Sequence, residues 1–119
     1  MFKSIPEIEF VPKSNNIVLI NELKYHDLRS NKLFIVPAGF TCDGASIPKF
    51  AWSIVGHPFS KKVRAGAVLH DWLYRNGVVP RGEADQIFYD ALREYNMGYF
   101  KAQAFYMAVR TFGGSSYKG

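Results

Sequence analysis

The sequence predicts an α+β domain in which a small N-terminal antiparallel sheet or hairpin precedes a long connector and three helices. Apolar and polar residues alternate in the first third of the chain. Proline and glycine crowd the region of residues 37–59, and apolar spacing becomes helical from residue 60 onward. Strands that come first, with helices after them, are typical of an α+β fold.

The length and composition are those of one ordinary globular domain. Of the 119 residues, 48% are apolar and 21% are charged, which excludes a chain that is disordered throughout. No internal repeat or linker is visible, so we expect residues 1–119 to form a single domain. The apolar runs fall far short of the roughly 20 residues of a membrane-spanning helix, so we expect no transmembrane segment. The single cysteine, Cys42, excludes a disulfide scaffold and is better explained as a small buried side chain than as a nucleophile.

Residues 5–37 are expected to form the β part. Residues 7–10 (EIEF) alternate polar and apolar side chains, and residues 17–26 (IVLINELKYH) are predicted to be one strand. A turn at residues 27–31 leads into the returning strand, residues 32–36 (KLFIV). The prediction is a two- to four-stranded antiparallel sheet.

Residues 37–59 form a connector of about twenty residues with no sustained helical period before about Lys49. So long a connector is unusual inside a compact domain and is often functional.

Residues 60–113 are predicted to hold three helices. The first begins at Ser60, a good N-cap, and stops at Gly77. The second begins at Pro80, which suits a first helical turn, and stops at Gly98. Because the loop between them is short, the two helices are expected to form an antiparallel pair.

The third helix is expected over residues 99–112, where apolar side chains recur at helical spacing before two glycines. The tail, residues 115–119, is expected to be frayed.

The net charge of +5 is concentrated in the helical half. Residues 1–59 carry six Lys/Arg and five Asp/Glu, a net +1, whereas residues 60–119 carry nine and five, a net +4. Such a charge suits an anionic partner, such as an acidic protein or a phospholipid headgroup, and it also serves plain solubility. The longest basic run is the pair at residues 61–62, and no nucleic-acid motif occurs, which argues against a nucleic-acid partner.

The first two predicted helices bring chemically active side chains together. His70 and Tyr74 are four residues apart and share one helix face. Asp71 points about 100° away, so we expect it to lie off the core face. The antiparallel return places Asp85 beside His70 and Tyr74. A carboxylate there can accept a proton from one ring nitrogen of His70 and leave the other nitrogen as a base, while Tyr74 donates to the same carboxylate.

These side chains also have plainer explanations. His70, Tyr74 and Asp85 can form a polar network that pins two helices together. Asp71 can pair with Arg75, its neighbour four residues on.

The sequence His70-Asp71, followed by Tyr74 and by Asp85 on the facing helix, resembles phospholipase A2 over residues 66–92. The resemblance implies a calcium-dependent ester hydrolase. His70 would take a proton from water, Asp85 and Tyr74 would orient His70, and Asp71 would bind Ca²⁺.

The nearest substitute for the glycine-rich calcium loop of that family is residues 39–46 (GFTCDGAS), about 25 residues before the helix. Asp43 could be a second carboxylate ligand of the metal, or it could close an Asx-type turn. Ser46 could donate its hydroxyl. A zinc-type hydrolase using His70, Asp71 and Asp43 is a third option, although protein zinc sites usually carry more His or Cys.

A second resemblance covers residues 33–113. The segments 36–48 (VPAGFTCDGASIP), 70–74 (HDWLY), 84–89 (ADQIFY) and 106–113 (YMAVRTFG) are similar to a small domain family of phage and prophage genomes with no assigned function. That resemblance implies a viral origin and a role in a particle, in lysis or in host takeover. No basic segment followed by an apolar stretch opens the chain, so we expect no signal peptide and a place in the virion or the host cytoplasm.

The sequence therefore predicts one of two functions. The first is a non-enzymatic phage protein, such as a tail or baseplate component or a binder of a host protein, whose aromatic and basic surface makes the contacts. The second is an active phospholipase A2-like lipid hydrolase that uses Ca²⁺ and whose basic half favours anionic lipid surfaces.

Overall fold

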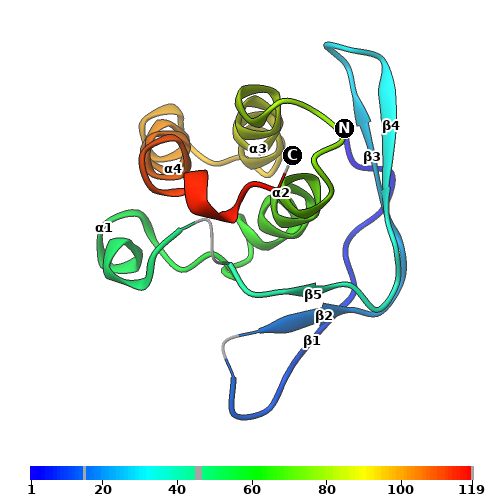
Figure 1. The fold of residues 1–119 in the computed structure, drawn as a ribbon, viewed down its shortest axis with the longest axis horizontal. Coiled ribbons are helices and arrows are strands. Elements are labelled where there is room, and N and C mark those ends of the chain that lie inside the picture. The colour runs from blue at the N-terminus through cyan, green and yellow to red at the C-terminus, as the bar shows by residue number, and fades with distance from the viewer. Residues whose placement is uncertain (15, 45–46, 119) are drawn as a thin grey trace. The chain divides into compact units, whose positions relative to one another are not determined.

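The computed structural model describes residues 1–14, 16–44 and 47–118. The chain divides into two compact units, Met1–Asp43 and Gly44–Gly119 (Figure 1). The first unit carries the antiparallel strands and the second carries the helices, so the predicted α+β class is confirmed. That the two units form a single domain stays a prediction.

The first unit contains two small antiparallel sheets. One has the strand order β1-β2-β5, from β1 (Ile8–Phe10), β2 (Ile17–Leu19) and β5 (Thr41–Cys42). The other is a hairpin of β3 (Leu23–Asp27) and β4 (Lys32–Val36), the returning strand that the sequence predicts.

The prediction of one strand over residues 17–26 is wrong. The two halves of that segment have different partners, since β2 pairs with β1 and β5 whereas β3 pairs with β4. The chain must therefore bend between them, and the exposed polar residues Asn21 and Glu22 occupy the bend. An apolar run does not reveal which strand it will pair with, which is why the break is invisible in the pattern.

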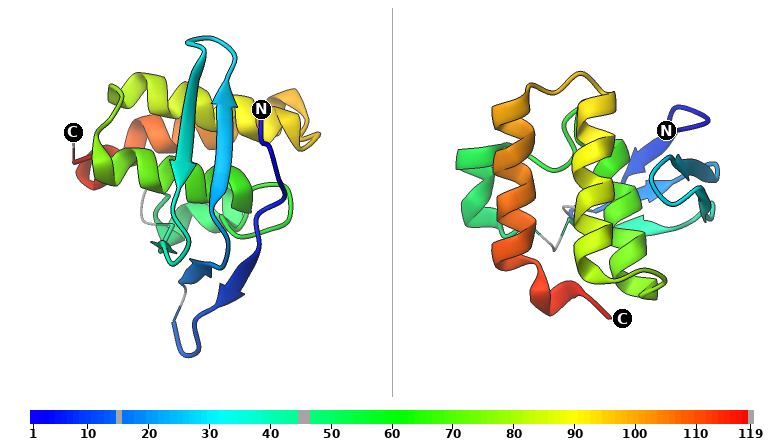
Figure 2. Two further views of the ribbon diagram at one scale, coloured as in Figure 1. Left: turned by 90° about the vertical axis from the view of Figure 1, so that its right-hand side faces the viewer. Right: turned by 90° about the horizontal axis from the view of Figure 1, so that it is seen from above.

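The second unit is built from helices that pack within it. After a 3₁₀ turn, η1 (Lys49–Ala51), come α1 (Trp52–Val55), α2 (Arg64–Asn76), α3 (Arg81–Glu94) and α4 (Tyr99–Phe112). The α3 helix packs against both α2 and α4, and α1 packs against α4 (Figure 2). The buried core cluster lies among these helices and the loops between them: Ile47, Ala51, Val55, Val63, Ala67, Phe88, Leu92, Met97, Ala102, Phe105, Ala108 and Val109.

Two of the predicted helix boundaries are wrong. Ser60 is not the N-cap of α2, because the helix begins at Arg64 after Val63, and the Ser60 hydroxyl donates to the carbonyl of His57 at 3.0 Å instead of capping the first turn. Gly98 does not stop the second helix either. That helix ends at Glu94, and Gly98 is the N-cap of α4.

Asn96 explains the early end of α3. It takes a left-handed backbone with φ of 63°, and the next N–H, that of Met97, closes back onto the carbonyl of Leu92. Asparagine tolerates this conformation better than most residues, so it can end a helix as glycine does. The other predicted boundaries are confirmed: Gly77 caps α2 with φ of 58°, Pro80 precedes α3, and α4 spans residues 99–112.

The connector and the tail are more ordered than the sequence suggests. The connector contains β5, η1 and α1, and its first helical turn begins at Lys49, where the sequence predicts that helical spacing can start. The tail contains a short 3₁₀ turn, η2 (Gly114–Ser116). Beyond it, the hydroxyl of Tyr117 donates to the Val79 carbonyl at 2.7 Å, and the N–H of Lys118 donates to the Tyr74 carbonyl at 2.8 Å. These bonds hold residues 117 and 118 against the end of α2, so the expectation of fraying is wrong for the described part of the tail.

Within the described residues, no helix combines the length and the apolar character needed to cross a membrane.

Candidate functional site

A glycine lets the predicted antiparallel pair, α2 and α3, approach closely. A Cβ at Gly66 would lie 3.3 Å from the Cβ of Ala91 and 3.3 Å from a ring carbon of Phe88. A methyl group at Gly66 would already require Phe88 or Ala91 to shift, and a bulky side chain has no room there. The close approach brings the polar side chains of the two helices within hydrogen-bond range.

The predicted geometry between His70, Tyr74 and Asp85 is confirmed. The Nε2 atom of His70 lies 2.7 Å from Oδ1 of Asp85, and the hydroxyl of Tyr74 donates to the same oxygen at 2.5 Å. Because an ionised carboxylate can only accept hydrogen bonds, Nε2 of His70 carries the proton in this contact. The imidazole orientation that the sequence analysis expects is therefore present.

Two arginines, Arg110 and Arg81, complete the network, and the sequence pattern predicts neither of them. Arg110 of α4 donates to Oδ2 of Asp85 at 2.8 Å, so both carboxylate oxygens are engaged. Arg81 donates to the Tyr74 hydroxyl at 3.2 Å and to the carbonyls of Val109 and Arg110 at 2.9 and 2.7 Å. These two carbonyls belong to the last turn of α4. The network thus joins three helices.

The hydrogen bonds help to set the protonation states of Asp85 and Tyr74. Burial by itself would raise the pKa of Asp85, but the bonds from His70, Tyr74 and Arg110 outweigh burial, so the pKa of Asp85 lies below its usual value. Burial, together with the bond to Asp85, raises the pKa of Tyr74 well above its ordinary value. At neutral pH the network therefore holds an ionised carboxylate and a protonated phenol.

The network is enclosed. The exposed fraction is 1% for His70 and 0% for both Tyr74 and Asp85. The imidazole ring lies 4.1 Å from the ring of Tyr74 and 4.8 Å from that of Phe88, measured between ring centroids. In this arrangement a substrate reaches His70 only if the groups that cover its ring move.

Asp71 does not lie off the core face, so that expectation is wrong. Only 3% of Asp71 is exposed. Its carboxylate pairs with the Nη2 atom of Arg75 at 3.2 Å, the pairing that the sequence offers as the plainer explanation. The pair supplies a counter-charge, which is what allows a carboxylate to be buried.

The metal roles of Asp71 and Asp43 stay predictions. Asp43 is the last residue of the first unit, whereas Asp71 belongs to the second. Ser46 lies outside the described residues. Over residues 1–14, 16–44 and 47–118 there is no group of three or more His, Cys, Asp or Glu side chains placed to hold a metal ion. Cys42 is fully buried, as expected of a small apolar side chain.

Comparison with known proteins identifies a family but no activity. Residues 17–109 match the model of a family described as "Protein of unknown function (DUF1353)". The chain is 37% identical over 78 residues to "Uncharacterized protein y4jT" of Sinorhizobium fredii (strain NBRC 101917 / NGR234), a match that covers 66% of this chain and 23% of that protein. It is 35% identical over 71 residues to "Uncharacterized protein y4iH" of the same strain, covering 60% of this chain and 30% of that protein.

These matches span less than a third of the length of either relative. No solved structure matches the chain. The predicted membership of a family without an assigned function is confirmed, while the association of that family with phages rests on the resemblance alone.

Proposed function

The chain belongs to the DUF1353 family of proteins of unknown function, and from that premise we propose that it is a non-enzymatic interaction protein. It is either a component of a phage particle, such as part of the tail or baseplate, or a protein that binds a host protein. In this proposal the pair of His70 and Asp85 holds the helices together, and the exposed apolar side chains of the helical unit contact the partner.

The enclosed hydrogen-bond network is the observation that carries the proposal. A general base must come within hydrogen-bond reach of the proton that it takes. His70, at 1% exposed, is covered by the rings of Tyr74 and Phe88 and is already bonded to Asp85. No buried side-chain nitrogen or oxygen of the described residues lacks a hydrogen-bond partner. A fully satisfied polar network of this kind stiffens a small fold.

The helical unit also exposes the kind of side chain that protein partners contact. Phe100 is 85% exposed and Met107 is 57% exposed, and they lie seven residues apart on α4. Phe50 of η1 and Phe112 at the end of α4 are 66% and 45% exposed, and their rings meet edge to face at 5.2 Å. Contiguous exposed apolar patches mark interaction sites, and aromatic side chains within them often supply much of the binding energy.

The test is to follow a tagged chain in cells that make the phage or prophage particle. The proposal predicts that the chain sediments with particle proteins or with one defined host protein. The variant that carries both Phe100→Ser and Met107→Ser should lose this association and stay folded. Leu28→Ser, which removes from the first unit one apolar side chain whose exposure (69%) lies between those of Met107 and Phe100, is the control. Recovery of only the free chain in such cells contradicts the proposal.

A second candidate, a calcium-dependent phospholipase A2-like hydrolase, is favoured by one observation. The distances from Asp85 to His70 (2.7 Å) and to Tyr74 (2.5 Å) are those of an oriented general base. In this candidate the helices open at a lipid surface, His70 activates water, and Asp71 binds Ca²⁺. It predicts fatty-acid release from anionic phospholipid vesicles that needs Ca²⁺ and disappears in His70→Ala and in Asp71→Ala. The hydrolase candidate is rejected if the wild-type protein releases no more fatty acid than vesicles without protein do. It is also rejected if both variants release as much fatty acid as the wild type.

A further inference from the structure

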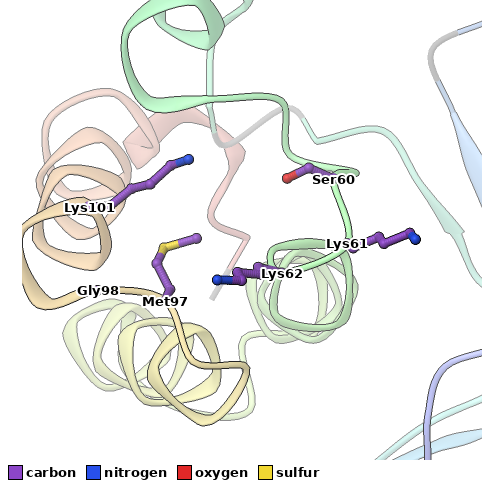
Figure 3. A pocket seen from close by; sticks show the side chains of 6 residues that line it. All are labelled: Ser60, Lys61, Lys62, Met97, Gly98 and Lys101. Carbon is purple, nitrogen blue, oxygen red and sulfur yellow. The ribbon is translucent and has the colours of Figure 1, made fainter.

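A pocket of about 260 Å³ lies in the helical unit, and none of the side chains of the His70 network lines it. It is formed by the residues that lead into α2 and by the loop and first turn that open α4 (Figure 3). Its lining residues are Ser60, Lys61, Lys62, Met97, Gly98 and Lys101. The space far exceeds the roughly 10–15 Å³ that one water molecule needs, so it can hold a small ligand.

The pocket is cationic. Lys62 and Lys101 direct their ammonium ends into the space from opposite sides, whereas the ammonium end of Lys61 points away from it (Figure 3). Within the described part of the chain, none of these three lysines forms an ion pair with a carboxylate. Lys62 instead donates to the carbonyl of Asn96 at 3.4 Å. Two like charges that converge on one space repel each other unless an anion lies between them.

The start of α4 adds to this positive potential. Gly98, the N-cap of this 14-residue helix, lines the pocket, no side chain caps it, and the first turn contains no acidic residue. The first N–H groups of a helix lack partners within the helix and carry partial positive charge. Arg93 donates to the carbonyl of Met97 at 2.9 Å, which brings a further cation to the same loop.

We infer that this pocket binds the phosphate group of a small phosphorylated molecule or of a phospholipid headgroup. The phosphate oxygens would accept hydrogen bonds from the ammonium groups of Lys62 and Lys101 and from backbone N–H groups at the start of α4. Met97, which is 2% exposed, gives the pocket an apolar wall. The inference goes beyond the proposed function, since it uses neither His70 nor the exposed aromatic side chains.

The first test is a titration of the full chain with inorganic phosphate at constant ionic strength, followed by the backbone amide resonances of residues 98–101. The inference predicts saturable shifts of these resonances. The variant that carries both Lys62→Gln and Lys101→Gln should bind at least about tenfold more weakly. Lys118→Gln is the control, because it removes one positive charge from an exposed lysine of the same unit that does not line the pocket. Shifts that do not saturate, or that weaken equally in the control, overturn the inference.

A second arm identifies the source of the phosphate. Vesicles of phosphatidic acid in phosphatidylcholine are compared with vesicles of phosphatidylcholine alone in a sedimentation assay. Binding that needs phosphatidic acid and is lost in the double variant assigns the site to a lipid headgroup. Saturable binding of inorganic phosphate without vesicle binding assigns it to a soluble ligand. If the wild-type protein binds neither probe, or if the double variant binds both as well as the wild type does, the inference fails.

Discussion

His70 of α2 and Asp85 of α3 lie 2.7 Å apart, Nε2 to Oδ1, with no more than 1% of either residue exposed. Asp85 also accepts hydrogen bonds from Tyr74 and Arg110, so one carboxylate collects donors from two helices besides its own. The Asp85 carboxylate therefore links three helices of the helical unit, and the stability of the fold should depend on its charge.

Asp85→Asn should lower the free energy of unfolding by about 3 kcal/mol. The amide has one acceptor oxygen where the carboxylate has two, and its NH₂ group faces donors that it cannot satisfy. Urea denaturation measures the change. Asp90→Asn on the same helix is the control, since Asp90 is half-buried and lies outside the network, and it should cost less than about 1 kcal/mol. Equal losses of unfolding free energy in the two variants would show that the Asp85 carboxylate has no special role in stability.

The stability of the protein should fall as the pH drops below about 4. The pKa of Asp85 is lower in the folded chain than in the unfolded chain, where it is about 3.9. The unfolded chain therefore binds the proton first, and the stability that the ionised carboxylate supplies is present above pH 4 and is lost as the pH falls through the folded value. Chemical denaturation between pH 6 and pH 2 measures this slope. In Asp85→Asn the free energy of unfolding should depend less steeply on pH. An unchanged dependence in that variant would show that other carboxylates cause the loss of stability in acid.

Arg81→Gln should loosen the last turn of α4. Arg81 donates to the carbonyls of Val109 and Arg110 in the last turn of α4, where helical partners run out. The Val109 carbonyl also accepts the backbone N–H of Gly113 at 2.9 Å, so Arg81 reinforces the point at which the helix is capped. We expect faster hydrogen exchange at amides 110–113 and a loss of about 1–2 kcal/mol. Arg93→Gln, which removes a hydrogen bond to one loop carbonyl, should leave these amides unchanged. Protection at the end of α4 that survives Arg81→Gln contradicts this role.

Gly66→Leu should destabilise the protein by about 1–3 kcal/mol, because the new side chain has no room between α2 and α3. By contrast, Gly82→Ala adds a methyl group to α3 at an ordinary contact distance, 3.7 Å from Arg110, and should be neutral or stabilising by up to about 1 kcal/mol. Thermal denaturation compares the two. A Gly66→Leu protein as stable as the wild type would mean that the helices do not need their close approach.

The local features of the site are predictable from the sequence, whereas the features that depend on distant residues are not. The spacing of His70 and Tyr74, and a short loop that returns the chain antiparallel, were enough to place Asp85 beside both. Arg110 lies 25 residues after Asp85 and on another helix. No periodicity relates the two, because how α4 packs on α3 depends on side-chain fit along both helices.

The fold shows the same division. The class, the β3–β4 hairpin and the extent of α4 follow from local pattern and breakers. The break after β2 does not, because it arises from strand pairing with distant partners. The end of α3 depends on Asn96 adopting a left-handed backbone, which is a weaker signal than glycine.

The central claim, that His70 is a closed structural group, is tested most directly by chemical modification of the three histidines. Diethyl pyrocarbonate is applied to the native protein, with and without Ca²⁺ and anionic vesicles, and modification is located by mass spectrometry. The account predicts that His57, exposed in its loop, reacts under all conditions and that His70 stays unmodified throughout. Modification of His70 at the rate of His57 once Ca²⁺ and vesicles are present would contradict the account and favour the hydrolase.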